Sequence, residues 1–107
     1  MPDKNAQRSL REDARRKVRN SLPVPAPVLK AVFNHLDTQL KSFECDDTLR
    51  HVRAFTHRHS LPEKAVVSWL KDNGGHCDCE ALANAEPVVH EAVPGYEDLT
   101  PSTNLSE

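Results

Sequence analysis

Apolar residues recur at helical spacing in three central segments of the chain. Between residues 27 and 43 they follow the 3.6-residue period of an amphipathic helix, and polar residues occupy the opposite face. The apolar positions of this segment are Val28, Leu29, Val32, Phe33, Leu36, Leu40 and Phe43. Shorter patterns predict two further helices, over 47–59 and 62–72. Their expected inward residues are Leu49, Val52, Phe55, Ala65, Val66, Trp69 and Leu70.

Capping signals predict where these helices begin and end. Asp46 is a suitable N-cap for the second helix. Ser60 can cap the third helix, and Glu63 would complete a capping box with it. Asn73, followed by two glycines, predicts a left-handed C-cap where the third helix ends.

The segment 77–85 fits two structures. Alternation of Cys77, Cys79 and Ala81 fits a short strand, whereas Asp78 followed by helix-forming residues fits a short helix that Asp78 caps. We expect the helix, because no partner strand is visible. The predicted fold class is therefore all-α or mainly α, a small three- to four-helix bundle with a flexible C-terminal tail.

Charge divides the 107 residues more sharply than the net charge of -2 suggests. Residues 1–21 form a basic N-terminal arm or helix, and residues 22–86 form the predicted helical domain. No Lys or Arg follows Lys71. Residues 87–107 are acidic and proline-containing with little periodicity, so we expect an acidic disordered tail there.

Several classes of protein are not expected from this composition. No apolar run is long enough to cross a membrane, and the N-terminus lacks an apolar signal region, so a cytoplasmic protein is expected. There is no glycine-rich phosphate loop, nucleophile elbow or His-Glu-x-x-His motif, which argues against an enzyme. The basic arm could contact nucleic-acid phosphates, but it has no aromatic side chain for base stacking. We favour a solvated helix that pairs with the acidic tail.

Candidate metal ligands concentrate in the segment 74–80, which holds two of the three cysteines. An odd number of cysteines argues against a closed disulfide framework. Zinc takes four tetrahedral ligands from Cys, His or carboxylate groups. The candidate set is Cys45, Cys77, Cys79 and His76, with His51, Asp47 and Glu80 as alternatives for the fourth position. Two other interpretations stay open: the cysteines are small buried hydrophobes, or they form a redox pair.

Topology predicts that the cysteines lie close together. Cys45 closes the first core helix, and the pair Cys77 and Cys79 follows the third. In an up-down-up bundle these two junctions lie at the same end. The histidines are not expected to bind a metal ion together. The spacing of His51, His57 and His59 prevents joint chelation, so we expect a solvated basic face.

Two segments carry a resemblance to a known family. The first reads Cys45-Asp46-Asp47-Thr48-Leu49-Arg50, and the second, which follows Trp69-Leu70, reads Gly74-Gly75-His76-Cys77-Asp78-Cys79-Glu80-Ala81-Leu82-Ala83-Asn84. Over about residues 22–86 the chain resembles the small bacterial proteins of domain of unknown function 2695. The resemblance implies a bacterial, cytoplasmic protein and no established activity. Asp47 stands where that family often has His, and His76 where it often has an aromatic residue.

The interpretation that fits these observations is a small helical binding or accessory module with a cysteine-based metal site and zinc as its cofactor. Such a module would act on a protein partner. One alternative is a thiol redox or metal-handling protein. A weaker one is a nucleic-acid-binding protein that uses the basic arm. No membrane association is expected.

Overall fold

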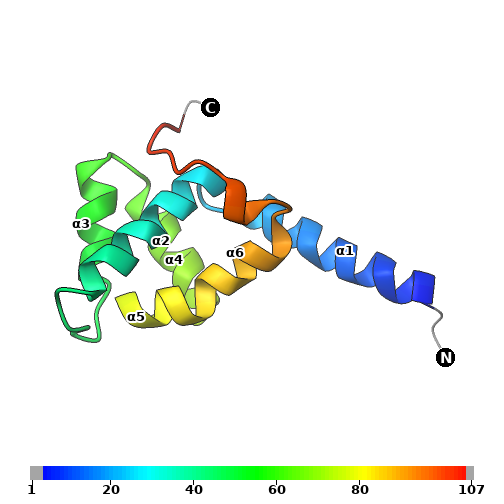
Figure 1. Ribbon diagram of the computed structural model, residues 1–107, viewed down its shortest axis with the longest axis horizontal. Coiled ribbons are helices and arrows are strands. Elements are labelled where there is room, and N and C mark those ends of the chain that lie inside the picture. The colour runs from blue at the N-terminus through cyan, green and yellow to red at the C-terminus, as the bar shows by residue number, and fades with distance from the viewer. Residues whose placement is uncertain (1–3, 106–107) are drawn as a thin grey trace.

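Helices make up the regular structure of the described chain, residues 4–105, in the computed structural model (Figure 1). Side chains are described from Leu10 onward, and residues 1–3 and 106–107 of the predicted arm and tail lie outside the described part. The elements are α1 (Lys4–Ser21), α2 (Ala26–Leu40), α3 (Arg50–Arg58), α4 (Glu63–Asp72), α5 (Asp78–Glu80), the π-helix η1 (Ala81–Ala85), α6 (Glu86–Ala92) and the 3-10 helix η2 (Tyr96–Asp98). No strand occurs in residues 4–105, so the all-α prediction is confirmed.

Helix α2 forms the centre of the core. Pro27 stands in its first turn, where the missing N–H of proline has no helical partner to lose. The inward side chains of α2 are fully buried, namely Val28, Leu29, Val32, Phe33 and Leu36. They pack with residues of α3, α4 and η1, and Trp69 of α4 belongs to this core as predicted. The apolar period of the sequence therefore identified the core face of α2 correctly.

Two residues that were predicted to lie in the core are exposed. Helix α2 ends at Leu40, so Phe43 belongs to the following loop and is 52% exposed. Ala65 points outward from α4, and Val67 is buried instead. The predictions failed because both positions lie at the edge of an apolar stripe, where helix length and orientation decide burial.

The connection between α3 and α4 closes α3 and does not form the predicted capping box. Ser60 has a left-handed backbone, with φ 54°. The N–H of Leu61 donates to the carbonyl of Thr56 at 2.8 Å, and the N–H of Ser60 donates to that of His57 at 3.3 Å. This pair of bonds is a Schellman motif. Ser60 thus ends α3, and the start of α4 has no side-chain cap.

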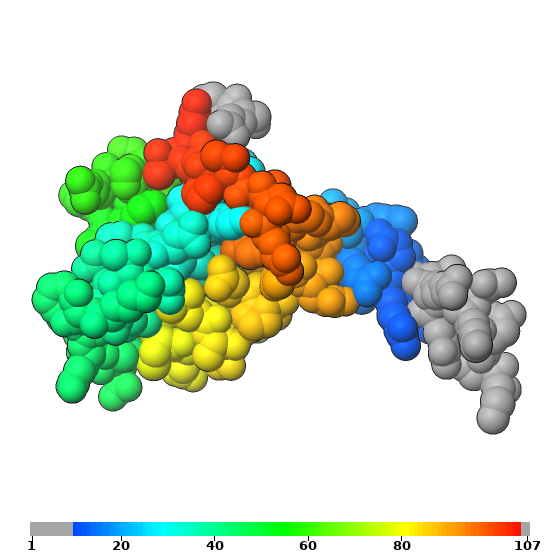
Figure 2. Space-filling view, viewed as in Figure 1, coloured from blue at the N-terminus to red at the C-terminus, as the bar shows by residue number. Residues whose placement is uncertain are grey.

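Residues 87–98, which the sequence predicted to be disordered, lie in α6, in the turn after it and in η2. Pro87 stands in the first turn of α6, where proline is tolerated. Val89, Ala92 and Tyr96 are buried, and the Tyr96 hydroxyl donates to a Glu86 carboxylate oxygen at 2.7 Å. Figure 2 shows the C-terminal segment lying over α2. The prolines were interpreted as a sign of disorder, whereas in the fold they begin and end a short helix. The division of the chain into arm, domain and tail otherwise stays a prediction.

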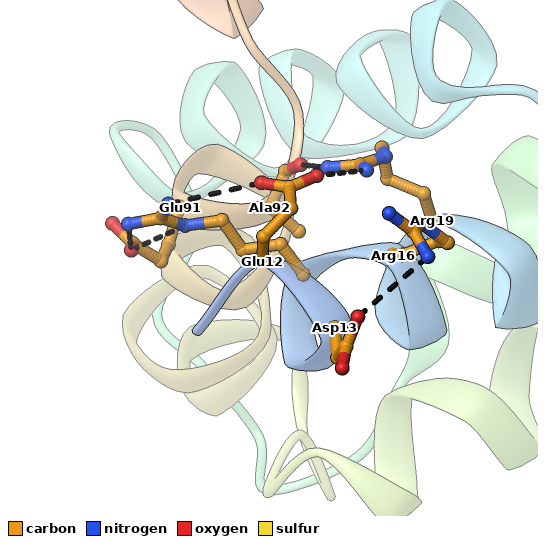
Figure 3. A network of polar contacts seen from close by, with 7 residues as sticks. Glu12, Asp13, Arg16, Arg19, Glu91 and Ala92 are labelled. Carbon is orange, nitrogen blue, oxygen red and sulfur yellow. Dashed lines mark hydrogen bonds and ion pairs between the residues drawn. The ribbon is translucent and has the colours of Figure 1, made fainter. Parts of the chain in front are cut away.

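Helix α1 extends away from the rest of the molecule and is attached through α6 (Figure 1). Arg15 donates two hydrogen bonds to one oxygen of Glu91, at 2.8 and 3.0 Å. Arg19 donates to the carbonyl of Ala92 and to Glu12, both at 2.7 Å (Figure 3). The bond from Arg19 lowers the pKa of Glu12. Arg15 and Arg19 of the arm therefore both contact α6, and Arg15 does so through an acidic residue of the segment that follows Lys71.

The end of α4 has the left-handed cap that the sequence predicted. Gly74 has φ 82°, and its N–H donates to the carbonyl of Lys71 at 3.2 Å. The N–H of Gly75 donates to the carbonyl of Leu70 at 2.7 Å. These are the two bonds of a Schellman motif. Gly75 also lies against η1, since a Cβ there would stand 2.9 Å from the Cα of Ala81.

We expect Gly75→Ala to lower the free energy of unfolding by about 2 kcal/mol, within the usual cost of overpacking. The added methyl group would meet backbone on two sides, at Ala81 and at the Leu70 carbonyl 3.1 Å away. Urea denaturation in the presence of a chelator measures the effect.

Gly95→Ala is the comparison, because a Cβ at Gly95 meets nothing within 4 Å. Only its left-handed backbone, with φ 72°, opposes the substitution, at a cost of about 1 kcal/mol. A smaller loss for Gly75→Ala than for Gly95→Ala would contradict the close approach of α4 and η1.

Candidate metal centre

The three cysteines come together from two segments of the chain. Cys45 lies in the loop between α2 and α3, Cys77 precedes α5, and Cys79 lies within α5. One ligand atom from each, the Sγ, lies within 4.8 Å of the other two. The sulfurs of Cys77 and Cys79 are 3.3 Å apart. The prediction that Cys45 lies near the pair is therefore confirmed.

Asp78 joins these two segments. Its carboxylate accepts hydrogen bonds from the backbone N–H of His51 at 3.0 Å and of Val52 at 3.2 Å, at the start of α3. Its own N–H donates to the carbonyl of Thr48 at 3.0 Å. Asp78 is 1% exposed, and the N-terminus of a helix favours such a buried negative charge. Asp78 thus caps α3 and fixes the cysteines on either side of it.

Asp46 does not cap α3 as the sequence predicted. Its Oδ1 accepts from the N–H and the hydroxyl of Thr48, at 3.1 and 2.6 Å. These bonds form a local turn that shapes the loop next to Cys45. The sequence offered a suitable cap nearby in the chain, but the fold supplies one from a segment that lies more than 25 residues further on.

The helical choice for 77–85 is correct, and a π-helical turn follows the site. In η1 the N–H of Glu86 bonds to the carbonyl of Ala81, five residues earlier. The side chain of Asn84 donates to the Gly74 carbonyl at 2.9 Å. Single π turns are frequent at functional sites. Here the turn directs Asn84 at the end of α4 and so holds α5 in place.

The three thiols differ in exposure and acidity. Cys77 is 3% exposed, and burial raises the pKa of its thiol to about 12. Cys79 is exposed, and its hydrogen bond to Cys45 raises its pKa. The backbone N–H of Cys79 stabilises the thiolate of Cys45 and lowers the pKa of Cys45. The hydrogen bonds within the cluster thus favour the thiolate form of Cys45.

The other ligands that the sequence predicted are not part of the three-cysteine cluster. His76 is exposed, and it is not one of the residues that share the cluster. Glu80 is also exposed and outside the group of three, but its Oε1 lies 3.4 Å from the sulfur of Cys77. His51 and Asp47 also stay outside the cluster.

His35 of α2 and His59, the residue that follows α3, form a partly buried aromatic group with Phe55, so the histidines are not simply a solvated face. His35 lies 4.9 Å from Phe55 between ring centroids, and His59 lies 4.4 Å from Phe55 on the same measure. Burial and the nearby His51 lower the pKa of His35. His57 is exposed as predicted. Periodicity placed Phe55 inward, yet it gave no sign that histidines would cover the ring.

The cysteine cluster has the size and chemistry of a metal-thiolate site. Zn–S bonds of about 2.3 Å at tetrahedral angles place sulfurs about 3.8 Å apart. The observed spacing, 3.3 Å for one pair and at most 4.8 Å for the others, needs only small adjustments to meet that value. Three thiolates would occupy three corners of the tetrahedron. Thiolate is a ligand that soft ions prefer.

The fold and the cluster define a small all-helical protein with a three-cysteine cluster that could hold a metal ion. The chain belongs to the DUF2695 family, described as "Protein of unknown function (DUF2695)", whose profile matches residues 32–84. The matched range contains Cys45, Cys77, Cys79 and the residues that join them, Asp78 and Asn84. The resemblance that the sequence suggested is thereby confirmed.

Full-length relatives occur in mycobacteria. The uncharacterized proteins Mb2294 of Mycobacterium bovis and Rv2271 of Mycobacterium tuberculosis H37Rv are each 32% identical to the chain over 90 residues. The matches cover 80% of this chain and 91% of each relative. No solved structure matches the chain.

Proposed function

We propose that this protein is a metal-binding accessory module in which Cys45, Cys77 and Cys79 hold one zinc ion, or a similarly soft ion, as thiolates. The observation that carries the proposal is the meeting of three sulfurs from distant segments within 4.8 Å. A site of this kind would link the loop after α2 to α5 and stabilise the small core, since structural zinc contributes directly to folding.

The surroundings of the cluster favour a cation. Four acidic residues adjoin the cysteines in sequence: Glu44 and Asp46 flank Cys45, while Asp78 and Glu80 flank Cys79. Asp78 is engaged with α3, and Arg50 pairs with Asp46 at 3.6 Å. Negative charge around a site raises the local concentration of cations.

Metal analysis tests the proposal. The protein is purified under reducing conditions, exposed to zinc and freed of loosely bound ions, and we expect about one zinc per chain, as a single structural site requires. At zinc concentrations about 100-fold above Kd, binding adds about 2.7 kcal/mol to stability, which raises Tm by about 10 °C or more. A chelator should reverse the shift. Protein that retains no zinc and melts at the same temperature with or without it would refute the proposal.

Thiol redox chemistry is the second candidate, because Cys79 is exposed and its sulfur lies 3.3 Å from that of Cys77. The same preparations distinguish it. Loss of two titratable thiols per chain after mild peroxide treatment, in protein that binds no zinc, would favour redox function instead.

Partners and location remain proposals. None of the helices in residues 4–105 is long and apolar enough to span a bilayer. We infer that the protein acts in the cytoplasm on a protein partner. Engagement of Arg15 and Arg19 with α6 and Glu12 supports a docked arm over a nucleic-acid contact, because it removes two cations from phosphate binding.

A further inference from the structure

Three thiolates leave one corner of a zinc tetrahedron to be filled. Zinc in structural sites is almost always four-coordinate, whereas Cu(I) is a soft ion that thiolates satisfy by themselves. The fourth ligand therefore affects how tightly the site holds zinc and not how tightly it holds Cu(I). His76, the sequence-predicted fourth ligand, is exposed and stays outside the cluster.

Glu80 is placed to reach the ion. Its Oε1 already lies 3.4 Å from the Cys77 sulfur. Glu80 ends α5, and Cys77 is the extended N-cap residue three positions before it, a spacing at which an N3 side chain can reach back to the N-cap residue. Its side chain is exposed, so rotation about its own bonds can bring the carboxylate onto an ion without moving the backbone.

Two of the other carboxylates near the cysteines, those of Asp78 and Asp46, are engaged elsewhere. Asp78 accepts from the backbone N–H groups of His51 and Val52. Asp46 accepts from Thr48 and pairs with Arg50. Turning either one toward the cluster would leave hydrogen-bond donors without their acceptors, at a cost that Glu80 does not incur.

We propose that the carboxylate of Glu80 is the fourth ligand, so that the site presents three sulfurs and one oxygen to a divalent tetrahedral ion. This inference rests on the proposed function. Cys79 and Glu80 are both exposed, so the Glu80 corner faces solvent and the ion enters and leaves on that side. Glu80 then raises the affinity of the site for zinc and leaves its affinity for Cu(I) unchanged, because only the four-coordinate ion needs the carboxylate.

Competition with chromophoric chelators tests the assignment in the full chain, with Zn2+ and Cu(I) as separate probes. Glu80→Ala and Glu80→Gln should weaken zinc binding by at least about 10-fold, a loss that even outer-shell changes produce. Cu(I) affinity should stay as in the wild type. With Co2+ as a spectroscopic probe, the ligand-field bands should shift in Glu80→Ala while the sulfur-to-metal charge-transfer absorption persists. Helical circular dichroism checks that the variants fold.

His76→Ala is the matched control, since it removes a neighbouring exposed side chain that sequence favoured as the ligand. It should bind both ions as the wild type does. Wild-type zinc affinity and an unchanged Co2+ spectrum in Glu80→Ala would overturn the assignment and leave the three-cysteine site standing. The same would follow if His76→Ala lost zinc affinity instead. A wild-type protein that binds no zinc would overturn both proposals.

Discussion

Cys45→Ala should abolish tight zinc binding and remove about 3 kcal/mol of zinc-dependent stability, the amount that binding adds when zinc is about 100-fold above Kd. Cys45 is the one cysteine of the cluster outside the 77–79 pair, and its sulfur lies within 4.8 Å of both others. Without it, the ion would no longer link the loop after α2 to α5. Metal analysis and thermal melts, each with and without zinc, measure the two losses.

Measurements on the zinc-free protein distinguish a role of Cys45 as a metal ligand from a role in packing alone. Cys45 is only partly buried, so its removal should cost about 1 kcal/mol when no metal is present, as is typical of a single substitution. Ser42→Ala, an exposed change in the same loop, is the control and should leave zinc binding intact. Equal losses for Cys45→Ala with and without zinc would mean that the residue only packs.

Asp78→Ala should destabilise the zinc-free protein by about 3 kcal/mol, because it leaves two backbone donors at the start of α3 without an acceptor. Asp78→Asn should lose less, since one oxygen acceptor remains. Chemical denaturation under reducing conditions with a chelator measures both. Zinc affinity should fall as well, because Asp78 holds α5 against the loop that carries Cys45.

Asp46→Ala is the comparison that distinguishes the two candidate caps. Its carboxylate serves only a local turn and a solvent-exposed ion pair, so its loss should cost about 1 kcal/mol or less. If Asp46→Ala proved more destabilising than Asp78→Ala, the capping of α3 by Asp78 would be wrong.

The segment from Gly74 to Asn84 shows how a motif can be recognised before its parts are understood. The glycine pair was enough to predict the left-handed cap at Gly74, because the backbone preference of glycine is a local property. Three other features of the segment depend on packing between elements. They are the close approach at Gly75, the cap that Asp78 provides for α3, and the bond from Asn84 to Gly74. No pattern within a single element reports such contacts, so the sequence marked Asp78 only as the cap of its own helix.

In the C-terminal segment the sequence predicted disorder where the structure has a helix. Pro87 and Pro94 were interpreted as breakers in a disordered tail, and the apolar residues between them are too few to show a period. Tertiary packing supplies what the local pattern lacks, since Val89, Ala92 and Tyr96 are buried against the rest of the molecule. A helix of seven residues is not stable by itself in water, so its presence follows from that burial.

By itself the sequence determined the all-α fold, the inward face of α2, the cap at Gly74 and the nearness of Cys45 to Cys77 and Cys79. These properties depend on helical periodicity, glycine conformation and the order of helices in a short chain, all of which are local or topological. Only the tertiary structure decided that Asp78 caps α3, that α6 packs on the core, and that a Glu80 oxygen lies 3.4 Å from the Cys77 sulfur. Each of these depends on the distance between side chains from separate turns or helices, and that distance is set by how the whole core packs.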